Sequence, residues 1–304
     1  MASYRLLSYA GDDGQANAGI LVGDSVFNLA SEIAGQDNAD ISAASLQTVL
    51  DNWDDAEPVL RAIADNPGTT ARNIEDVKLC APIARPTAIY CAAANYYDHA
   101  REMGNGDLDK SKLKPYFFIK SSSVVIGPGD DVRLPQGHSE KYDWEVEINA
   151  IVGREARNLT VDNALDCLAG YCILNDLSAR DHVRREDWPF GTDWFSHKSW
   201  DTSCSIGPWI TPASEIGDVQ NLDLKTWISG KLMQESNSDQ MVFSTAELLD
   251  SISSQLTLKP GDMIATGTCA GVGAFTGTFL KPGDDIRMEV EGLGELKNPV
   301  VAGD

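Results

Sequence analysis

Apolar and polar residues follow one pattern near the N-terminus and another in the rest of the chain. Residues 5–29 contain short apolar runs separated by Asp and Gly turns, which predict strands. Residues 46–53 carry apolar side chains at intervals of three and four, and the stripe repeats after Pro58, so two helices are expected. The Asn-Pro-Gly of residues 66–68 interrupts the pattern. We therefore predict a small α+β domain over residues 1–73.

Strand signals dominate the remainder, which we take as one larger domain over residues 74–304. Few helices are expected there, chiefly one that starts with a capping box at Ser244 and one over residues 160–168. Because regular strand–helix alternation is missing, we predict a mixed α/β, strand-rich roll or sandwich with flanking helices. The expected strands are residues 88–92, 116–120, 144–152, 171–175, 205–211, 223–229, 262–266 and 285–291.

Charge and composition remove several classes of function. In 304 residues, 24 Lys and Arg stand against 46 Asp and Glu, which gives a net charge of −22. That balance argues against nucleic-acid or anionic-membrane partners, since both need clustered basic residues. The sequence has no run of about 18 apolar residues and no signal-peptide pattern at its start. Its six cysteines form no CxxC pair, so we expect reduced thiols in a cytoplasmic protein.

The most informative polar residues lie in an apolar, strand-like segment. Glu145 and Glu147 are two residues apart, so they point to the same face of the expected strand. Two neighbouring carboxylates near a core are costly unless a cation or a proton neutralises them. A hard cation such as Mg²⁺, Mn²⁺ or Ca²⁺ suits carboxylate oxygens. The alternative is the solvated face of an edge strand.

Two further segments add candidate groups. Asp176 ends an apolar run and can supply a third oxygen ligand, or it can cap the turn that follows. His99 and Glu102 are adjacent on one face if their segment is helical. A carboxylate beside an imidazole orients the ring and raises its basicity, as a water-activating base requires, although surface pairing is the simpler alternative.

Together these segments resemble the fumarylacetoacetate hydrolase family, in particular members with a small N-terminal domain. The resemblance covers most of the chain, from about residue 74 to residue 300. The matching segments are CAAANYYDH (91–99), DWEVE (143–147), NDLSARD (175–181), HKSWDT (197–202) and ATGTCAGVG (265–273). The resemblance implies a β-roll with flanking helices and a homodimer.

The resemblance also implies roles for individual residues. The metal ligands for Mg²⁺ or Mn²⁺ are expected to be Glu145, Glu147 and Asp176. His99 and Glu102 are expected to activate water from a mobile lid that continues into residues 103–114. The remaining expected site residues are Lys120 and Lys198 near the metal and substrate, and Thr268 at the carboxylate end of the substrate.

Two departures from the family pattern concern the substrate. Several members carry a glutamine seven residues after the metal-binding aspartate, where this chain has Val183, followed by Arg184 and Arg185. The usual Thr-Gly-Thr-Pro turn ends here in Cys269. Either arginine could hold a distal carboxylate of the substrate through a bidentate pair, or both could be surface charges.

The resemblance implies a hydrolase that cleaves the carbon–carbon bond of an acylpyruvate, a 2,4-dioxo acid, to pyruvate and a carboxylic acid. Two alternatives use the same site, oxaloacetate decarboxylation and isomerisation of a 2-hydroxydienoate. A third is a non-catalytic metal-binding module, because fold and function separate easily. The expected partner is a small 2-oxo acid.

Overall fold

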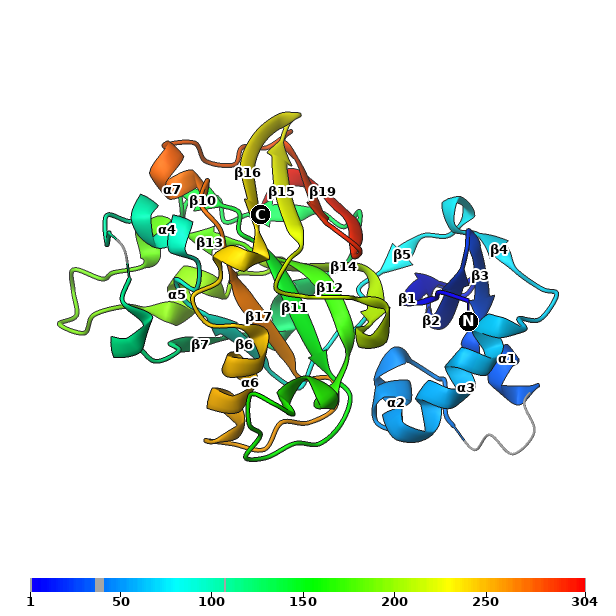
Figure 1. Cartoon of the computed structure of the whole chain (residues 1–304). Helices are drawn as coiled ribbons and strands as arrows, with labels where there is room; N and C mark the ends of the chain where they lie inside the picture. The colour runs from blue at the N-terminus through cyan, green and yellow to red at the C-terminus, as the bar shows by residue number, and fades with distance from the viewer. Residues whose placement is uncertain (1, 36–40, 107, 304) are drawn as a thin grey trace.

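The computed structural model describes residues 2–35, 41–106 and 108–303. Figure 1 shows the N-terminal elements, in blue, gathered at one side of a strand-rich body. The first elements are β1 (Arg5–Ala10), β2 (Ala16–Val22), β3 (Ser25–Asn28), α1 (Leu29–Ala34), α2 (Leu46–Leu50), α3 (Trp53–Asp65), β4 (Arg72–Asn73) and β5 (Leu79–Cys80). The expected strands and helices of this region are therefore confirmed. The break between α2 and α3 falls at residues 51–52, and Pro58 lies inside α3.

One large sheet runs through both parts of the molecule. Its strands follow the order β4-β3-β2-β1-β14-β12-β11-β17-β6-β7, with β5 and β8 paired alongside. Strand β11 lies between β12 and β17, so the segment that carries the paired glutamates is interior. The strands not yet given are β6 (Ile89–Ala92), β7 (Phe117–Lys120), β8 (Val125–Ile126), β11 (Val146–Val152), β12 (Leu168–Asp176), β14 (Cys204–Pro212) and β17 (Met263–Thr268).

A second sheet of five strands, in the order β16-β15-β18-β19-β9, packs against the first, and β10 pairs with β13. Together the sheets confirm the strand-rich α/β roll. These strands are β9 (Val132–Leu134), β10 (Tyr142–Asp143), β13 (Ser178–Ala179), β15 (Asp223–Ile228), β16 (Lys231–Asn237), β18 (Asp285–Val290) and β19 (Gly294–Ala302).

Helices are few, as expected. They are α4 (Tyr97–Glu102), α5 (Trp194–Lys198), α6 (Thr245–Ser253) and α7 (Gly273–Thr276). Ser244 caps α6 through the expected capping box. The helix expected over residues 160–168 is wrong: residues 164–167 form a single 3-10 turn, and β12 already begins at Leu168. No helix in the described ranges is long and apolar enough to cross a membrane.

Candidate active site

Three carboxylates meet at the centre of the large sheet. Glu147 lies on β11, Glu145 immediately precedes that strand, and Asp176 ends β12 beside it, because Val146 pairs with Asn175. Glu145, Glu147 and Asp176 are 6%, 1% and 0% exposed, and one carboxylate oxygen from each lies within 4.8 Å of the others. This burial rules out the alternative of a solvated edge strand. The described part of the chain contains no second cluster of this kind.

Buried cations neutralise two of the three carboxylates. The Lys198 Nζ donates to Glu145 Oε2 at 2.9 Å and to Asp176 Oδ2 at 2.5 Å, and Lys120 Nζ donates to Asp176 Oδ1 at 2.6 Å. Arg180 Nη2 donates to Glu145 Oε1 at 2.5 Å. Burial alone would raise the pKa of Glu145, but Lys198 and Arg180 lower it below its ordinary value. Both predicted lysines therefore lie at the cluster.

The third carboxylate lacks such compensation. Its recorded hydrogen bond comes from the backbone N–H of Gly267, which lies 2.6 Å from Glu147 Oε2. Burial and the nearby charges of Asp176 and Glu145 raise the pKa of Glu147 well above its ordinary value. A divalent cation placed among the three carboxylates would supply the missing positive charge, and an all-oxygen donor set suits Mg²⁺ or Mn²⁺. The residues present therefore fit a hard metal ion.

Arg180 is a member of this site that the sequence reasoning did not select. Besides Glu145 it binds Asp143, whose Oδ1 accepts from Arg180 Nε at 2.7 Å, while the Asp143 Oδ2 accepts from the N–H of Ala274 at 2.8 Å. Burial raises the pKa of Asp143 to about 6, although Arg180 opposes the shift. Its position inside the matched segment 175–181 was the signal that could have identified it.

The His–Glu pair forms as expected on the short helix α4. His99 Nδ1 and Glu102 Oε2 are 3.3 Å apart, and the imidazole is 6% exposed. The N–H of Gly271 donates to both carboxylate oxygens of Glu102, at 2.9 and 3.2 Å, and the Phe275 ring meets His99 edge-on. The turn between β17 and α7 therefore holds this pair from the opposite side. Sequence patterns could not reveal this backbone donor.

A buried glutamine on β16 links the second sheet to the site. Gln234 accepts from the Val146 N–H and the Thr226 hydroxyl and donates to Thr268 Oγ1 and the Cys269 carbonyl. The Thr268 hydroxyl itself donates to the Val146 carbonyl at 2.9 Å. Thr268 is thus at the site, but its hydroxyl proton is used within the protein.

A cavity of about 150 Å³ brings these groups together. Predicted residues His99, Glu145, Lys198 and Thr268 line it. The two predicted arginines are exposed and do not belong to its described lining; Arg185 binds Asp187 through two hydrogen bonds of 3.0 and 2.6 Å. The full described lining is Ala92, Ala93, Ala94, His99, Met103, Phe118, Glu145, Arg180, Val183, Trp194, His197, Lys198 and Thr268.

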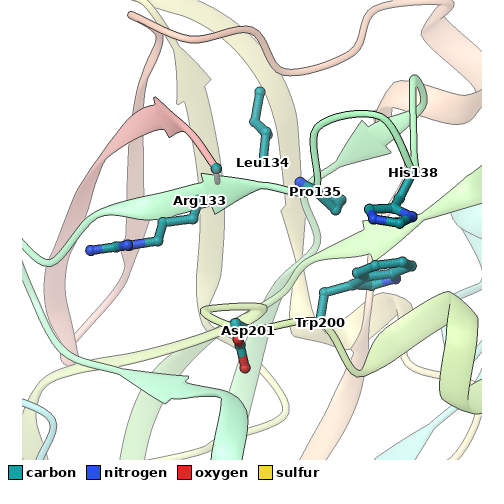
Figure 2. Close-up of a pocket in the computed structure, with 7 residues that line it drawn as sticks. Arg133, Leu134, Pro135, His138, Trp200 and Asp201 are labelled. Atoms are coloured by element: carbon teal, nitrogen blue, oxygen red, sulfur yellow. The ribbon is translucent and has the colours of Figure 1, made fainter.

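A second hollow lies at the end of β9. Figure 2 shows His138 lying against Trp200, with Leu134 and Pro135 on the neighbouring segment. The ring centroids of His138 and Trp200 are 5.7 Å apart. None of the three clustered carboxylates and neither member of the His–Glu pair lines this hollow, so the chemistry of the described residues is concentrated in the first cavity.

Comparisons with known proteins agree with this site. Residues 88–301 match the family model described as fumarylacetoacetate (FAA) hydrolase C-terminal. The chain belongs to the fumarylacetoacetate hydrolase family and is a metal-dependent enzyme of that family.

Among its relatives is the mitochondrial oxaloacetate tautomerase fahd2 of Xenopus laevis, which is 39% identical over 74% of this chain and 69% of that protein. The mitochondrial oxaloacetate tautomerase FAHD2B of Bos taurus is 38% identical over 80% and 75% of the two chains.

Solved structures resemble the whole chain. Maleylpyruvate hydrolase from Sphingobium sp. SYK-6, in complex with manganese(II) and pyruvate, has a TM-score of 0.79 at 28% identity and covers 99% of this chain and 100% of its own. The 2-hydroxyhepta-2,4-diene-1,7-dioate isomerase from Mycobacterium marinum has a TM-score of 0.73 at 27% identity, with 99% of each chain covered. The strand-rich fold with a small N-terminal sheet is therefore shared with both.

Proposed function

We propose that this enzyme hydrolyses the C3–C4 bond of a short acylpyruvate and releases pyruvate and a carboxylic acid. The observation that carries the proposal is that Glu145 of the metal-type carboxylate cluster and His99 of the His99–Glu102 pair line the same cavity. Hydrolysis needs both: stabilisation of negative charge on the 2-oxo acid and a base for the attacking water. The manganese–pyruvate complex of the similar maleylpyruvate hydrolase supports the same choice.

Mg²⁺ or Mn²⁺ held by Glu145, Glu147 and Asp176 would supply Lewis-acid stabilisation of negative charge on the 2-oxo acid, and Ca²⁺ is a further candidate. Glu102 accepts from Nδ1 of His99 and leaves Nε2 to take a proton from water. Since Lys198 and Arg180 line the same cavity, their cationic groups stabilise the oxyanion that forms at C4. Lys120 Nζ donates to Asp176 Oδ1 and so fixes the orientation of that carboxylate.

A second candidate, tautomerisation of oxaloacetate, is favoured by the names of the Xenopus and Bos relatives. Here a base removes a proton from C3 of the keto form, and the 2-oxo oxygen gains a proton, which gives the enol. No carbon–carbon bond is broken. His99 serves as that base, and no water is consumed. Decarboxylation of oxaloacetate and isomerisation of a 2-hydroxydienoate remain alternatives that use the same residues.

The test is a pair of assays on the Mn²⁺-loaded protein: pyruvate release from acetylpyruvate, and the keto–enol change of oxaloacetate followed by ultraviolet absorbance. We expect metal-dependent pyruvate release that falls about 100-fold or more in His99→Ala, because a positioned base contributes about 10²–10⁴ in rate. The matched control, His138→Ala, changes a histidine outside the cavity. Tautomerase activity without pyruvate release from any acylpyruvate would reject the hydrolase in favour of the second candidate.

The proposal also covers the binding partners, the oligomeric state and the cellular location of the protein. The substrate is a small 2-oxo acid, and neither nucleic acid nor membrane is a partner, as the net charge of −22 suggests. A homodimer and a cytoplasmic location stay predictions; the Xenopus and Bos relatives are named as mitochondrial.

A further inference from the structure

The walls of the catalytic cavity differ sharply in chemistry. Glu145, Arg180 and Lys198 form a charged side. The rest of the described lining, apart from His99, His197 and Thr268, is apolar: Ala92, Ala93, Ala94, Met103, Phe118, Val183 and Trp194. On the apolar side the Phe118 and Trp194 rings stack, with centroids 4.4 Å apart and an interplanar angle of 2°.

The two cationic side chains that line the cavity already bind carboxylates. Arg180 binds Asp143 and Glu145, and Lys198 binds Glu145 and Asp176. The charged and apolar sides meet where Lys198 Nζ lies 5.1 Å from the centroid of the Phe118 ring. A second, distal carboxylate would need a further positive partner to offset its desolvation.

The indole and hydroxyl donors that line the cavity are already used within the protein. The indole N–H of Trp194 donates to Tyr116 Oη at 3.2 Å, and the Thr268 hydroxyl donates to the Val146 carbonyl. His197 is 3% exposed, and its Nδ1 lies 2.9 Å from the Ala179 carbonyl oxygen, which can only accept, so the proton is on Nδ1.

His197 is neutral in this position. Burial, followed by the charges of Lys198 and Arg180, lowers the pKa of His197 to about 3. The neutral ring keeps a lone pair on Nε2, which repels a carboxylate and accepts from a hydroxyl or a water. The exposed Arg185, which is bound to Asp187, lies outside the described lining of the cavity.

We infer that the substrate is uncharged beyond C4, with a short alkyl, aryl or hydroxyalkyl group against Phe118, Val183 and Trp194, and that 2-oxo acids with a distal carboxylate at C5 or beyond are rejected. This inference rests on the proposed function, because it places the pyruvate end at the carboxylate cluster. It does not concern oxaloacetate, whose second carboxylate is C4 itself and would lie at Arg180 and Lys198. Val183 is then a specificity-determining residue.

Binding of two unreactive ligands of equal length tests the inference without turnover. 2-Oxopentanoate and 2-oxoglutarate differ only in whether C5 is a methyl or a carboxylate. We expect calorimetry on the Mn²⁺-loaded wild-type protein to give at least about tenfold tighter binding of 2-oxopentanoate, the size expected for burying an unpaired charge. Val183→Arg should reverse the order, while the matched variant Val183→Ile should retain it.

Each outcome decides the question. Equal affinities, or tighter 2-oxoglutarate binding in the wild type, would overturn the inference even if Val183→Arg failed to fold. Oxalate, which mimics the pyruvate enolate, separates this failure from that of the proposed function. If oxalate binds with Mn²⁺ but neither oxo acid does, the uncharged pocket is wrong and the metal site stands. If oxalate does not bind with Mn²⁺, both proposals fall.

Discussion

The carboxylate cluster and the His99–Glu102 pair each contribute one residue, Glu145 and His99, to the same cavity but are held in place by different means. The cluster stands on β11 and β12, two interior strands whose backbone groups pair on both sides, and two of its three carboxylates are paired with buried lysines and an arginine. The pair stands on the six-residue helix α4, where the Gly271 N–H binds Glu102 and the Phe275 ring contacts His99.

The difference indicates that the cluster serves metal binding and the His99–Glu102 pair serves proton transfer. A cluster held on two interior strands presents a fixed set of oxygens to a cation, which is what metal selectivity requires. A base on a short helix with few partners can shift relative to that cluster, as lids over active sites do. Substitutions in the two regions should therefore separate metal binding from turnover.

The largest effect is expected from Glu147→Gln. Mn²⁺ affinity should fall more than about 100-fold, since even partners outside a ligand set cost 10–100-fold, and turnover should fall with it. The metal-free variant should melt no lower than the wild type, because the buried Glu147 is repelled by Asp176 and Glu145. Calorimetric titration and thermal melts measure both. A melting temperature lowered by several degrees without metal would contradict the electrostatic account of the cluster.

Glu102→Gln should affect the His99–Glu102 pair and leave the carboxylate cluster unchanged. The amide oxygen can still accept from the Gly271 N–H, but the charge that orients and polarises His99 is lost. Turnover should fall about 10–100-fold while Mn²⁺ affinity stays within twofold of the wild type. If metal affinity fell as far as turnover, the two regions would not be independent.

Gln234→Leu tests a link that serves both regions. The substitution leaves the buried Val146 N–H and the Cys269 carbonyl without their partner, which should cost about 3 kcal/mol in the free energy of unfolding. Because Val146 lies between the two glutamates, Mn²⁺ affinity should weaken as well. Urea unfolding and metal titration provide the measurements, with the exposed Gln255→Leu as a control. Unchanged metal affinity would limit Gln234 to a structural role.

A pH effect is expected from His197. Its folded pKa of about 3 lies below the ordinary value of 6.5, so the unfolded chain takes up a proton first as the pH falls. The stability contribution is therefore present above pH 6.5 and is lost as the pH falls toward 3. Between pH 6.5 and about pH 5, the wild type should lose about 1.5 kcal/mol more than His197→Gln. Parallel urea curves for the two proteins would show that His197 is not held neutral.

The smallest effect is expected from Arg185→Ala. The guanidinium is exposed and paired with Asp187, so turnover should change less than about twofold and stability by less than about 0.5 kcal/mol. A loss of about tenfold or more in kcat/KM for an acylpyruvate would return Arg185 to the substrate site. Lys225→Ala, which removes another exposed ion pair, is the matched control.

Much of the cluster was predictable from sequence because its signal is local. The two-residue spacing of Glu145 and Glu147 within an apolar run already placed two charges on one strand face. The i, i+3 spacing of His99 and Glu102 was equally informative once a helix was assumed. Asp176 was a candidate third ligand because it ends an apolar run, and the pairing of β11 with β12 brings it beside the glutamates.

The remaining contacts depend on tertiary structure. Strand β16, which carries Gln234, is mostly polar and has one fully buried position. Its sequence therefore shows no alternation of apolar and polar residues that would predict a buried Gln234. The Gly271 N–H is a backbone group; the positive φ of Gly271 (+102°) and its close approach to the Met233 carbonyl explain why a glycine is needed there. The helix expected over residues 160–168 failed because residues 164–167 form a single 3-10 turn and Leu168 already begins β12.

The continuity of the large sheet has a practical consequence for dissecting this enzyme. Strand β1 pairs with β14, and Leu6, Leu60 and Ile210 share one core with residues from β11 and β12. Cutting the chain back to the family-matching residues 88–301 would strip a strand from β14 and open that core to water. The N-terminal segment is thus a covering layer for the catalytic sheet. A folded catalytic fragment of this enzyme must therefore include the N-terminal segment.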